Sequence, residues 1–230
     1  MFKFTAIEDS ILNPTLWIGN FEWREPITTL TDLLTSMVCL SIFIYLKNYK
    51  GAKSESFKHY KYYFLFFFFS MFSAAWFGHG LQAYVGFDWK KIGWVLSSFG
   101  FLQIEIATLK DVKTYISKKL HNFLNVSFYI QFAILVPLMV YYQNFKIPQL
   151  NSTLAFVLFV LPLQSYLYYK TKNKGHLIIV GTILYAAIPG SIYNNKLSLS
   201  PWFNYHDISH VLMAVFMLLI FRGILKIAKV

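Results

Sequence analysis

The chain has 230 residues, of which 57% are hydrophobic, 20% aromatic and only 13% charged, whereas soluble domains carry about 25% charged residues. This composition excludes an ordinary soluble domain and predicts a protein with several membrane-spanning segments. The formal net charge is +11, but the basic residues fall in short runs between apolar segments. That distribution is typical of cytoplasmic loops and not of a surface that binds nucleic acid.

Seven apolar segments follow a short polar N-terminal segment, residues 1–27, and we expect residues 1–230 to form a single domain. A helix needs about 20 apolar residues to cross the core of a bilayer, and each segment has close to that length. Pro189 and Gly190 predict a kink in the sixth. The fold class is therefore an all-α membrane protein, a seven-transmembrane helix bundle. The predicted spans are 28–46, 62–84, 92–109, 123–142, 152–169, 176–193 and 205–225.

Basic residues are distributed unequally between the two ends of this bundle. Loops at one end hold 15 Lys and Arg residues and loops at the other end hold 6, which predicts the N-terminus outside and the C-terminus inside. Glu105 is expected near the inner face, where Lys110 can pair with it. Arginine occurs only at Arg24 and Arg222, and the Lys-, Phe-, Ile- and Asn-rich composition indicates an AT-rich bacterial genome. We therefore expect a multi-pass protein of a bacterial inner (cytoplasmic) membrane.

Three histidines are expected at one depth near the outer surface. His206 and His210 open the seventh span and lie one turn apart on one helix face, about 6 Å from each other, which suits two ligands of a metal ion. His79 lies 17 residues beyond Tyr62, or about 25 Å from the inner start of its span. Ionisable groups in spanning segments are candidates for function, so His79, His206 and His210 form a candidate metal site.

Carboxylates near these histidines could assist chemistry at a bound zinc ion. Zinc accepts three imidazole nitrogens at about 2.0 to 2.1 Å and keeps a fourth position for water, whose pKa it lowers to about 7. A neighbouring carboxylate can orient a ligand or move the proton of that water. Asp207 lies about 100° around its helix from His206, so it is expected to act behind a ligand. The candidates are Asp88, Asp207 and Asp32.

At these residues the chain resembles the CREST superfamily of seven-helix membrane hydrolases, which includes alkaline ceramidases, adiponectin-receptor-like (PAQR) proteins and Per1-like lipid-remodelling proteins. The shared pattern is seven spans, a histidine late in the second, an acidic residue soon after it, and His-x-x-x-His in the seventh. The resemblance implies that His79, His206 and His210 bind zinc and that Asp88 is the acidic residue. The predicted orientation is similar to that of the ceramidase branch and opposite to that of the adiponectin receptors.

Two features depart from the family pattern. The family usually has a serine four residues before the first histidine, and Ala75 occupies that position. The ceramidase branch also has an acidic calcium site ahead of the first span. Glu22, Glu25 and Asp32 loosely match it, so a Ca²⁺ ion at this N-terminal acidic cluster is a further expectation.

The resemblance implies an intramembrane zinc-dependent hydrolase that cleaves a lipid amide or ester, as a ceramidase does, with zinc-activated water as the nucleophile. Its partners would be membrane lipids, including a lipid substrate whose acyl chain enters between the helices, and no nucleic acid. The alternative is a non-catalytic seven-helix receptor or sensor that binds metal, which Ala75 favours. A redox or transport protein is a third class, but haem between helices needs facing histidines, whereas His206 and His210 share one face.

Each of these residues also has a structural interpretation. His79 could cap a helix end, and His206 and His210 could bond carbonyl groups at the membrane surface. Asp32 could favour the N-terminus of a helix through the helix dipole. Four tryptophans are explained by an aromatic belt at the outer interface without any ligand, and these are Trp76, Trp89, Trp94 and Trp202.

Overall fold

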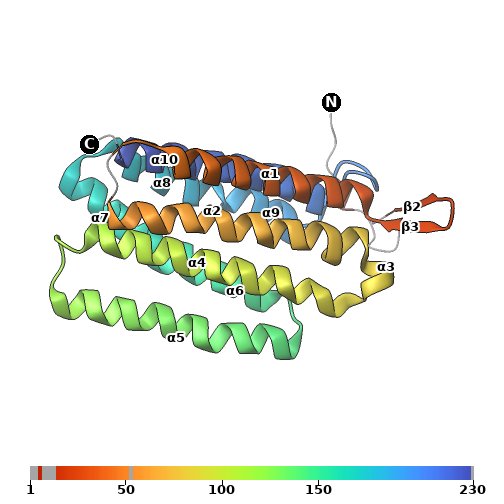
Figure 1. Ribbon diagram of the computed structural model, residues 1–230, viewed down its shortest axis with the longest axis horizontal. Coiled ribbons are helices and arrows are strands. Elements are labelled where there is room, and N and C mark those ends of the chain that lie inside the picture. Colours follow the sequence, from red (N-terminus) through yellow and green to blue (C-terminus); the bar gives the residue numbers. More distant parts are fainter. Residues whose placement is uncertain (1–4, 7–13, 52–53, 229–230) are drawn as a thin grey trace.

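The computed structural model describes residues 5–6, 14–51 and 54–228. Long helices run side by side along the longest axis of the molecule, with short β-ribbons at one end (Figure 1). The helices include the π-helices η1 and η3 and the 3-10 helix η2. They are α1 Pro26–Asn48, α2 Glu55–Ser73, η1 Ala74–Gly80, α3 Gln82–Val85, η2 Phe87–Trp89, α4 Lys90–Val112, α5 Lys118–Tyr142, α6 Lys146–Thr153, η3 Leu154–Val160, α7 Leu161–Thr171, α8 Lys174–Tyr185, α9 Ala187–Asn194 and α10 Tyr205–Ile227. The strands are β1 Thr5–Ala6, β2 Thr15–Ile18, β3 Phe21–Arg24 and β4 Leu197–Ser198, and β1 pairs with β4 and β2 with β3, both antiparallel.

Six helical stretches of the described chain are long and apolar enough to cross a membrane, which makes this a multi-pass membrane protein. The predicted second span is not among the six. It is the stretch formed by α2 and η1, residues 55–80, which exceeds the length that a bilayer core requires. Its Lys, Tyr, Trp and His residues make it less hydrophobic than its neighbours. The six are Pro26–Asn48, Phe87–Val112, Lys118–Tyr142, Lys146–Thr171, Lys174–Asn194 and Tyr205–Ile227.

Polar side chains cap the starts of several helices and explain why they begin outside the apolar runs. Ser54 accepts a hydrogen bond from the Phe57 amide, and Ser117 accepts one from the Leu120 amide. Such caps satisfy amide groups that the first turn of a helix leaves without a partner. The second predicted span therefore starts as a helix at residue 55 instead of 62, and the fourth at 118 instead of 123.

Three regular helices are interrupted, and proline accounts for two of the interruptions. The π-helix η3 ends two residues before Pro162, and the break between α8 and α9 falls at Ala186, three residues before Pro189. A proline has no amide hydrogen and its ring disturbs the preceding turn. The predicted kink is thus present one turn earlier than the proline itself. The third interruption, η1, contains no proline and carries His79.

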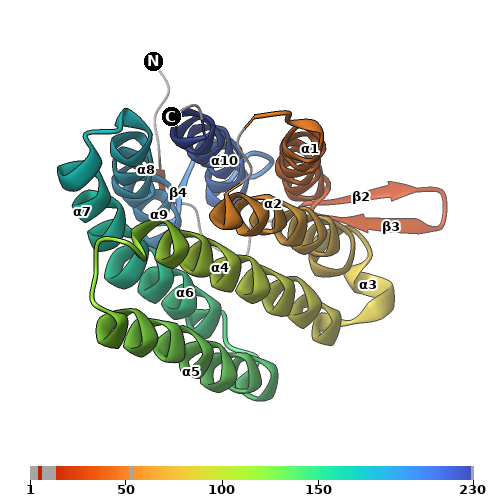
Figure 2. The ribbon, with the colours of Figure 1, turned by 60° about the vertical axis from the view of Figure 1, so that its left-hand side comes forward.

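Helix α2 occupies the centre of the bundle. It packs between α1 and α4, while α10 packs against α1 and α8, and α5 lies outside α4 (Figure 2). The largest cluster of buried side chains is built from these central helices and includes Tyr63, Phe64 and Phe67 of α2. Burial of such rings from lipid or water, with close packing between them, supplies most of the cohesion between helices.

A chain of buried hydrogen bonds joins four helices in the half of the bundle nearest the basic end. Tyr60 donates to the Asp111 carboxylate at 2.7 Å, and the Gln164 amide donates to the Tyr60 hydroxyl and to Thr108, both at 3.0 Å. Nδ1 of His176 lies 2.7 Å from the side-chain amide oxygen Oε1 of Gln164. Polar side chains that form hydrogen bonds across helices stabilise membrane bundles by about 0.6 kcal/mol each.

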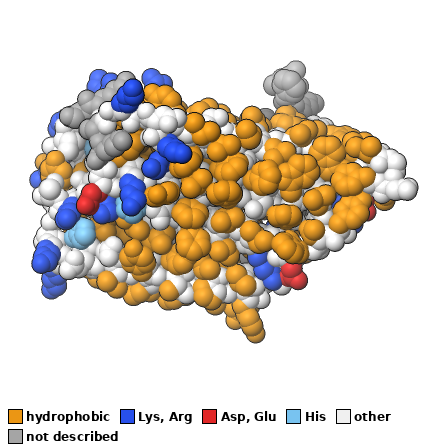
Figure 3. Space-filling model, viewed as in Figure 1, with side chains coloured by type: hydrophobic (Ala, Val, Ile, Leu, Met, Phe, Trp, Pro, Cys, Tyr) orange, Lys and Arg blue, Asp and Glu red, His pale blue; other side chains and the backbone are white. Residues whose placement is uncertain are grey.

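Lys and Arg side chains gather at the basic end of the bundle, and an apolar band covers the middle of the molecule (Figure 3).

The expected pairing of Glu105 with Lys110 is wrong. The ammonium group of Lys110 contacts Glu55 of α2 at 2.8 Å, because the side chain leaves α4 on its exposed side. Glu105 is only 2% exposed, and its Oε1 atom has no hydrogen-bond partner among the described residues.

The N-terminal segment contains a β-hairpin where the sequence analysis expected only a polar stretch. Strands β2 and β3 flank a two-residue turn at Gly19 and Asn20, and Gly19 has φ of 59°. Glycine takes this left-handed conformation without strain, which two-residue hairpin turns require. The hairpin projects from the start of α1, and β3 contacts α3 and η1 (Figure 2).

We expect Gly175→Ala to destabilise the fold, because α8 and α10 cross closely at this glycine. A Cβ atom at Gly175 would lie 2.6 Å from the carbonyl oxygen of Gly223 and 2.7 Å from the amide nitrogen of Ile227. Overpacking of this kind costs about 1 to 3 kcal/mol, measurable as a lower thermal midpoint in detergent. Gly181→Ala on the same helix is the control, because its Cβ meets no atom within 4 Å. Equal midpoints for the two variants would contradict the close crossing.

Candidate metal centre

Three imidazole rings converge at the end of the bundle opposite the basic loops. His79 comes from η1, and His206 and His210 come from the first two turns of α10. The ring centroid of His79 lies 6.3 Å from that of His206 and 6.2 Å from that of His210, and the centroids of His206 and His210 are 6.5 Å apart. The predicted shared depth of these residues is therefore confirmed, and their rings form a nearly equilateral triangle.

Asp32 of α1 lies against two of these rings. Its Oδ1 atom is 3.1 Å from Nδ1 of His210, and its Oδ2 atom is 3.6 Å from Nε2 of His79. The side chain has no exposed surface, and neither oxygen has a hydrogen bond of good geometry among the described residues. A buried carboxylate without hydrogen bonds is costly unless a cation compensates it. This side chain therefore indicates a place for positive charge.

Glu25 holds the other nitrogen of the His79 ring. Its Oε2 atom lies 2.6 Å from Nδ1 of His79, and both side chains are largely buried. Glu25 directly precedes α1 in the left-handed conformation, with φ of 46°. Burial acts to raise the pKa of Glu25, but the hydrogen bond and the charge interaction with His79 outweigh it, so the pKa lies below its ordinary value. The contact leaves Nε2 of His79 facing Asp32.

Threonines of α1 fix the position of α10. Thr28 donates to Oδ1 of Asp207 at 2.7 Å, and Thr35 donates to the backbone carbonyl of His210 at 3.0 Å. The hydroxyl of Thr31 lies 3.4 Å from Nδ1 of His210. These residues recur at intervals of three and four and therefore lie on one face of α1. This polar face, together with Asp32, contacts the helix turn that carries the two histidines.

Asp207, which the sequence predicted to act behind a ligand histidine, contacts α1 and the start of its own helix. Besides the bond from Thr28, its Oδ2 atom accepts from the backbone amide of Asn204 at 2.7 Å. The Asn204 side chain in turn accepts from the first turn of α10, which completes a capping box. Asp207 thus fixes the start of α10 and the orientation of its first turn.

Asp88 does not lie where the resemblance places it. Its side chain is 72% exposed and contacts the ammonium group of Lys91 and the side-chain amide of Gln143, both at 2.7 Å. Helix η2 turns it outward after Gly86, whose φ of 80° redirects the chain. Among the described residues, Asp32 and Glu25 are the carboxylates that contact His79.

The carboxylates expected to share a calcium ion have different partners. Glu22 pairs with Arg24 on the surface of the hairpin at 2.7 Å, Glu25 contacts His79, and Asp32 lies between two imidazoles. The strand alternation of β3 turns Glu22 away from the helix start. Within the described residues no three of the carboxylates, histidines or cysteine are close enough, as placed, to hold a metal ion.

The histidine triangle nevertheless fits zinc with a small contraction. Three imidazoles on one tetrahedral zinc, with bonds of about 2.0 to 2.1 Å, have ring centroids about 5 Å apart, roughly 1 Å closer than here. The tautomers also suit zinc, because Nδ1 of His79 and Nδ1 of His210 contact carboxylates and leave Nε2 of each ring as the ligand atom. A carboxylate behind a ligand imidazole is the usual arrangement in zinc sites.

Ala75 is fully buried one turn before His79. The hydroxyl that the family usually provides at this position is therefore absent from the α2 side of the site. The hydroxyls near the histidines belong instead to Thr28, Thr31 and Thr35 on α1.

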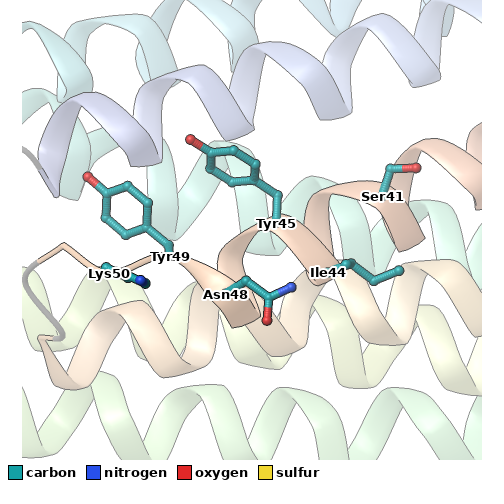
Figure 4. A pocket seen from close by; sticks show the side chains of 6 residues that line it. All are labelled: Ser41, Ile44, Tyr45, Asn48, Tyr49 and Lys50. Atoms are coloured by element: carbon teal, nitrogen blue, oxygen red, sulfur yellow. The ribbon is translucent and has the colours of Figure 1, made fainter.

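Two shallow pockets follow each other along the lipid-facing side of α1. The first lies at the C-terminal end of α1, and Figure 4 shows Tyr45 of this helix and Tyr49 just after it. The second lies between α1 and α10 and shares Ser41 and Tyr45 with the first. The first is lined by Ser41, Ile44, Tyr45, Asn48, Tyr49 and Lys50, and the second by Leu34, Met37, Val38, Ser41, Ile42, Tyr45, Leu218 and Phe221. The second pocket therefore ends within one turn of Asp32.

A sequence family described as "Family of unknown function (DUF6962)" matches residues 27–229. The chain belongs to this family. The match includes the three histidines and Asp32, and it begins after Glu25 and the hairpin. Comparison with curated proteins and with solved structures found no match. The family assignment therefore carries no activity with it, and the function has to be argued from the site.

Glu25 and the α1 threonines are the site residues that the sequence analysis did not assign to the histidines. A signal for Glu25 existed, since Glu25-Pro26 marks the start of a helix, with proline suited to the first turn. That signal locates Glu25 at the N-terminal end of α1. The contact itself depends on how α1 packs against η1.

We expect Glu25→Ala to lower the stability of the protein, because it leaves Nδ1 of buried His79 without its partner. Loss of a hydrogen bond to a charged group costs about 1.5 to 3 kcal/mol, which a thermal midpoint in detergent would report. Glu22→Ala is the matched control, since it removes only the exposed ion pair with Arg24. An unchanged midpoint for Glu25→Ala would show that the contact contributes nothing.

Proposed function

We propose that this protein is an intramembrane zinc-dependent hydrolase that cleaves an amide or ester bond of a membrane lipid. The observation that carries the proposal is the triangle of His79, His206 and His210 around the buried, unbonded carboxylate of Asp32. The resemblance to the CREST pattern supplies the reaction class, and the chemistry of three imidazoles with a neighbouring carboxylate supports it.

Each residue near the triangle has a role that follows from its contacts. Glu25 and Asp32 contact Nδ1 of His79 and of His210, so Nε2 of each ring would be the atom that binds the metal ion. Thr35, through the backbone carbonyl of His210, holds α10 at the correct height. A zinc ion bound there would polarise the substrate carbonyl and lower the pKa of a coordinated water to about 7.

Asp32 is the proton acceptor in this proposal. Oδ1 lies 3.1 Å from Nδ1 of His210, and Oδ2 accepts no hydrogen bond from the described residues, so Oδ2 is the oxygen available to a water molecule beside the triangle. A carboxylate in this position can take a proton from the attacking water and pass it to the leaving amine or alkoxide. Asp88 is too exposed and too firmly paired with Lys91 to do so.

The bilayer orientation that we propose has seven spans, with α2 and η1 as the second, the N-terminus outside and the C-terminus inside. The unequal Lys and Arg distribution supports the orientation, and the central position of α2 supports its crossing the bilayer with its neighbours. The histidine triangle then lies near the outer surface, at the depth of lipid headgroups. For a bacterial protein the host would be the cytoplasmic membrane.

The pockets along α1 suit a lipid substrate. From Leu34 to Lys50 they follow the helix for about 24 Å at 1.5 Å per residue, longer than the roughly 15 Å of one hydrocarbon leaflet. An acyl chain lying between α1 and α10 would place its headgroup linkage beside Asp32.

A non-catalytic metal-binding receptor or sensor is the second candidate. The buried Ala75 in place of a serine and the exposed position of Asp88 favour it, because both groups that the family pattern supplies for catalysis are missing from the site. A metal ion held by the same three histidines would then tie η1 to α10 without hydrolysing lipid.

We expect about one zinc ion per chain in carefully purified protein, held by three imidazole ligands, and its loss in His79→Ala, His206→Ala and His210→Ala. The three variants remove ligands from two different helices. Elemental analysis of detergent-purified protein measures the metal content.

His121→Ala is the control, because this histidine lies at the start of α5 at the opposite end of the bundle. It should retain the full metal content. Zinc that persists in both His79→Ala and His210→Ala would exclude the triangle as the binding site.

We expect Asp32→Asn to retain zinc but to lose hydrolysis of lipid amides or esters by about 10²- to 10⁴-fold, the usual contribution of a proton-transferring group. Asp88→Asn is its control and should hydrolyse lipid at the rate of the unchanged protein. The measurement is release of fatty acid from a panel of amide- and ester-linked lipids.

The opposite order of effects, with Asp88→Asn inactive and Asp32→Asn active, would transfer the acidic role to Asp88. A zinc-loaded protein that cleaves nothing in the panel would favour the receptor or sensor.

A further inference from the structure

The β-hairpin of β2 and β3 presents a wholly apolar face. The strand register pairs Leu16 with Trp23 and Ile18 with Phe21, and residues two apart along a strand share a face. These four side chains therefore lie together on one side of the hairpin. Residues 15–21 contain no charged side chain, and the ion pair of Glu22 and Arg24 lies at the base.

The apolar side chains of the hairpin are exposed to an extent that is unusual in water. On the apolar face Ile18 is 56% exposed and Leu16 40%, and Trp17 on the opposite face is 62% exposed. Trp23 and Phe21 contact Thr29 and Tyr84 of the bundle, whereas the end of the hairpin that carries Trp17 and Ile18 extends beyond the helices (Figure 2). Apolar patches of this kind mark a surface that contacts another apolar phase or partner.

The covalent connection places the hairpin at the surface of the membrane. Strand β3 ends at Arg24 and the spanning helix α1 begins at Pro26, so the base of the hairpin lies at the end of a spanning segment. The Phe21 ring stacks on Tyr84 at 5.6 Å, and the Tyr84 hydroxyl accepts from the Glu22 amide at 2.7 Å. The hairpin is therefore held against α3 at this depth.

The hairpin face also continues a belt of exposed aromatic side chains at this end of the bundle. Tyr84, Phe87 and Trp89 are about half exposed, and Tyr84 contacts the hairpin directly. Trp and Tyr side chains are enriched at the boundary between lipid headgroups and acyl chains. The exposed side chains of Leu16, Trp17 and Ile18 beside them match that boundary.

From this arrangement we infer that the hairpin is a membrane-surface anchor, whose apolar face is embedded at the headgroup–acyl boundary of the leaflet nearest the histidine triangle. Embedding fixes the depth of α1 and of Glu25, which follows the hairpin directly and contacts His79. The anchor requires insertion of the bundle in a bilayer but not the binding of zinc, so its test is independent of the proposed hydrolase.

A single fluorophore on the hairpin tests the anchor. Cys39 is the one cysteine of the chain and is fully buried, so a Cys39→Ala background allows an environment-sensitive label at Ile18→Cys. The control label is at Asn195→Cys, an exposed position beyond α9 at the same end of the bundle. The full-length protein is reconstituted in phosphatidylcholine–phosphatidylglycerol vesicles, and helical content by circular dichroism confirms folding.

For a hairpin embedded a few ångströms into the boundary, nitroxide lipids labelled near the headgroup should quench the label at position 18 at least about twofold more than at position 195. Nitroxides near the end of the acyl chain should quench it less, and aqueous iodide should quench only position 195. Equal iodide quenching at both positions would overturn the anchor. Shielding that appears only at high protein-to-lipid ratio would overturn it as well, because the occupant would then be a second copy of the chain.

Discussion

A carboxylate enclosed among apolar helices costs several kcal/mol unless positive charge or hydrogen-bond donors surround it. Asp32 is in this position, with no exposed surface and no hydrogen bond to its oxygens from the described residues. Its contacts are imidazole nitrogens of His79 and His210, from two other helices. A protonated imidazole or a shared metal ion can compensate the charge. The close approach of η1 and α10 to this point of α1 therefore depends on one buried charge.

The contacts between α1 and α10 show how the bundle preserves this approach. Thr28 and Thr35 each donate a hydrogen bond across the interface, and such bonds contribute only about 0.6 kcal/mol each in membrane bundles. The close crossing of α8 and α10 at Gly175 and Gly223 adds tight packing on the other side. Apolar packing thus supplies the cohesion of the bundle, while the threonines select one register between α1 and α10.

Much of the fold could be predicted from the sequence because hydrophobicity alone locates membrane helices. The predicted spans agree with the helices within a few residues, except where a polar cap such as Ser54 extends the helix beyond the apolar run. The hairpin was missed although Gly19-Asn20 between Trp-, Ile- and Phe-containing runs is a hairpin signal. The polar residues of the N-terminal segment favoured a prediction without strands, although this hairpin signal was present.

The histidines could be predicted as a group and Asp32 as one of three candidate carboxylates, but the sequence could not select Asp32 over Asp88. His79 lies in a π-helix, and the additional residue in such a turn changes the direction of the following side chains by about 100°. An extrapolation along a regular helix from Phe67 or Ser70 therefore gives the wrong face for His79. The distance from His79 to Asp32, 47 residues earlier in the sequence, depends on this turn and on helix packing. Proximity in sequence favoured Asp88 instead, which the turn at Gly86 directs outward.

Ala75 and the exposed Asp88 leave the α2 side of the site without a hydroxyl or a carboxylate, so the carboxylates and hydroxyls that contact the histidines come from Glu25 and α1. Helix α1 is also the helix that borders the lipid-facing pockets and connects to the hairpin. One helix therefore carries Asp32, the threonine hydroxyls, the residues that line the pockets and the connection to the hairpin. A shift of α1 along its axis would move Asp32 relative to His79 and His210 and would move the pockets at the same time. In the hydrolase that we propose, the position of α1 in the bilayer would therefore control both metal coordination and lipid access.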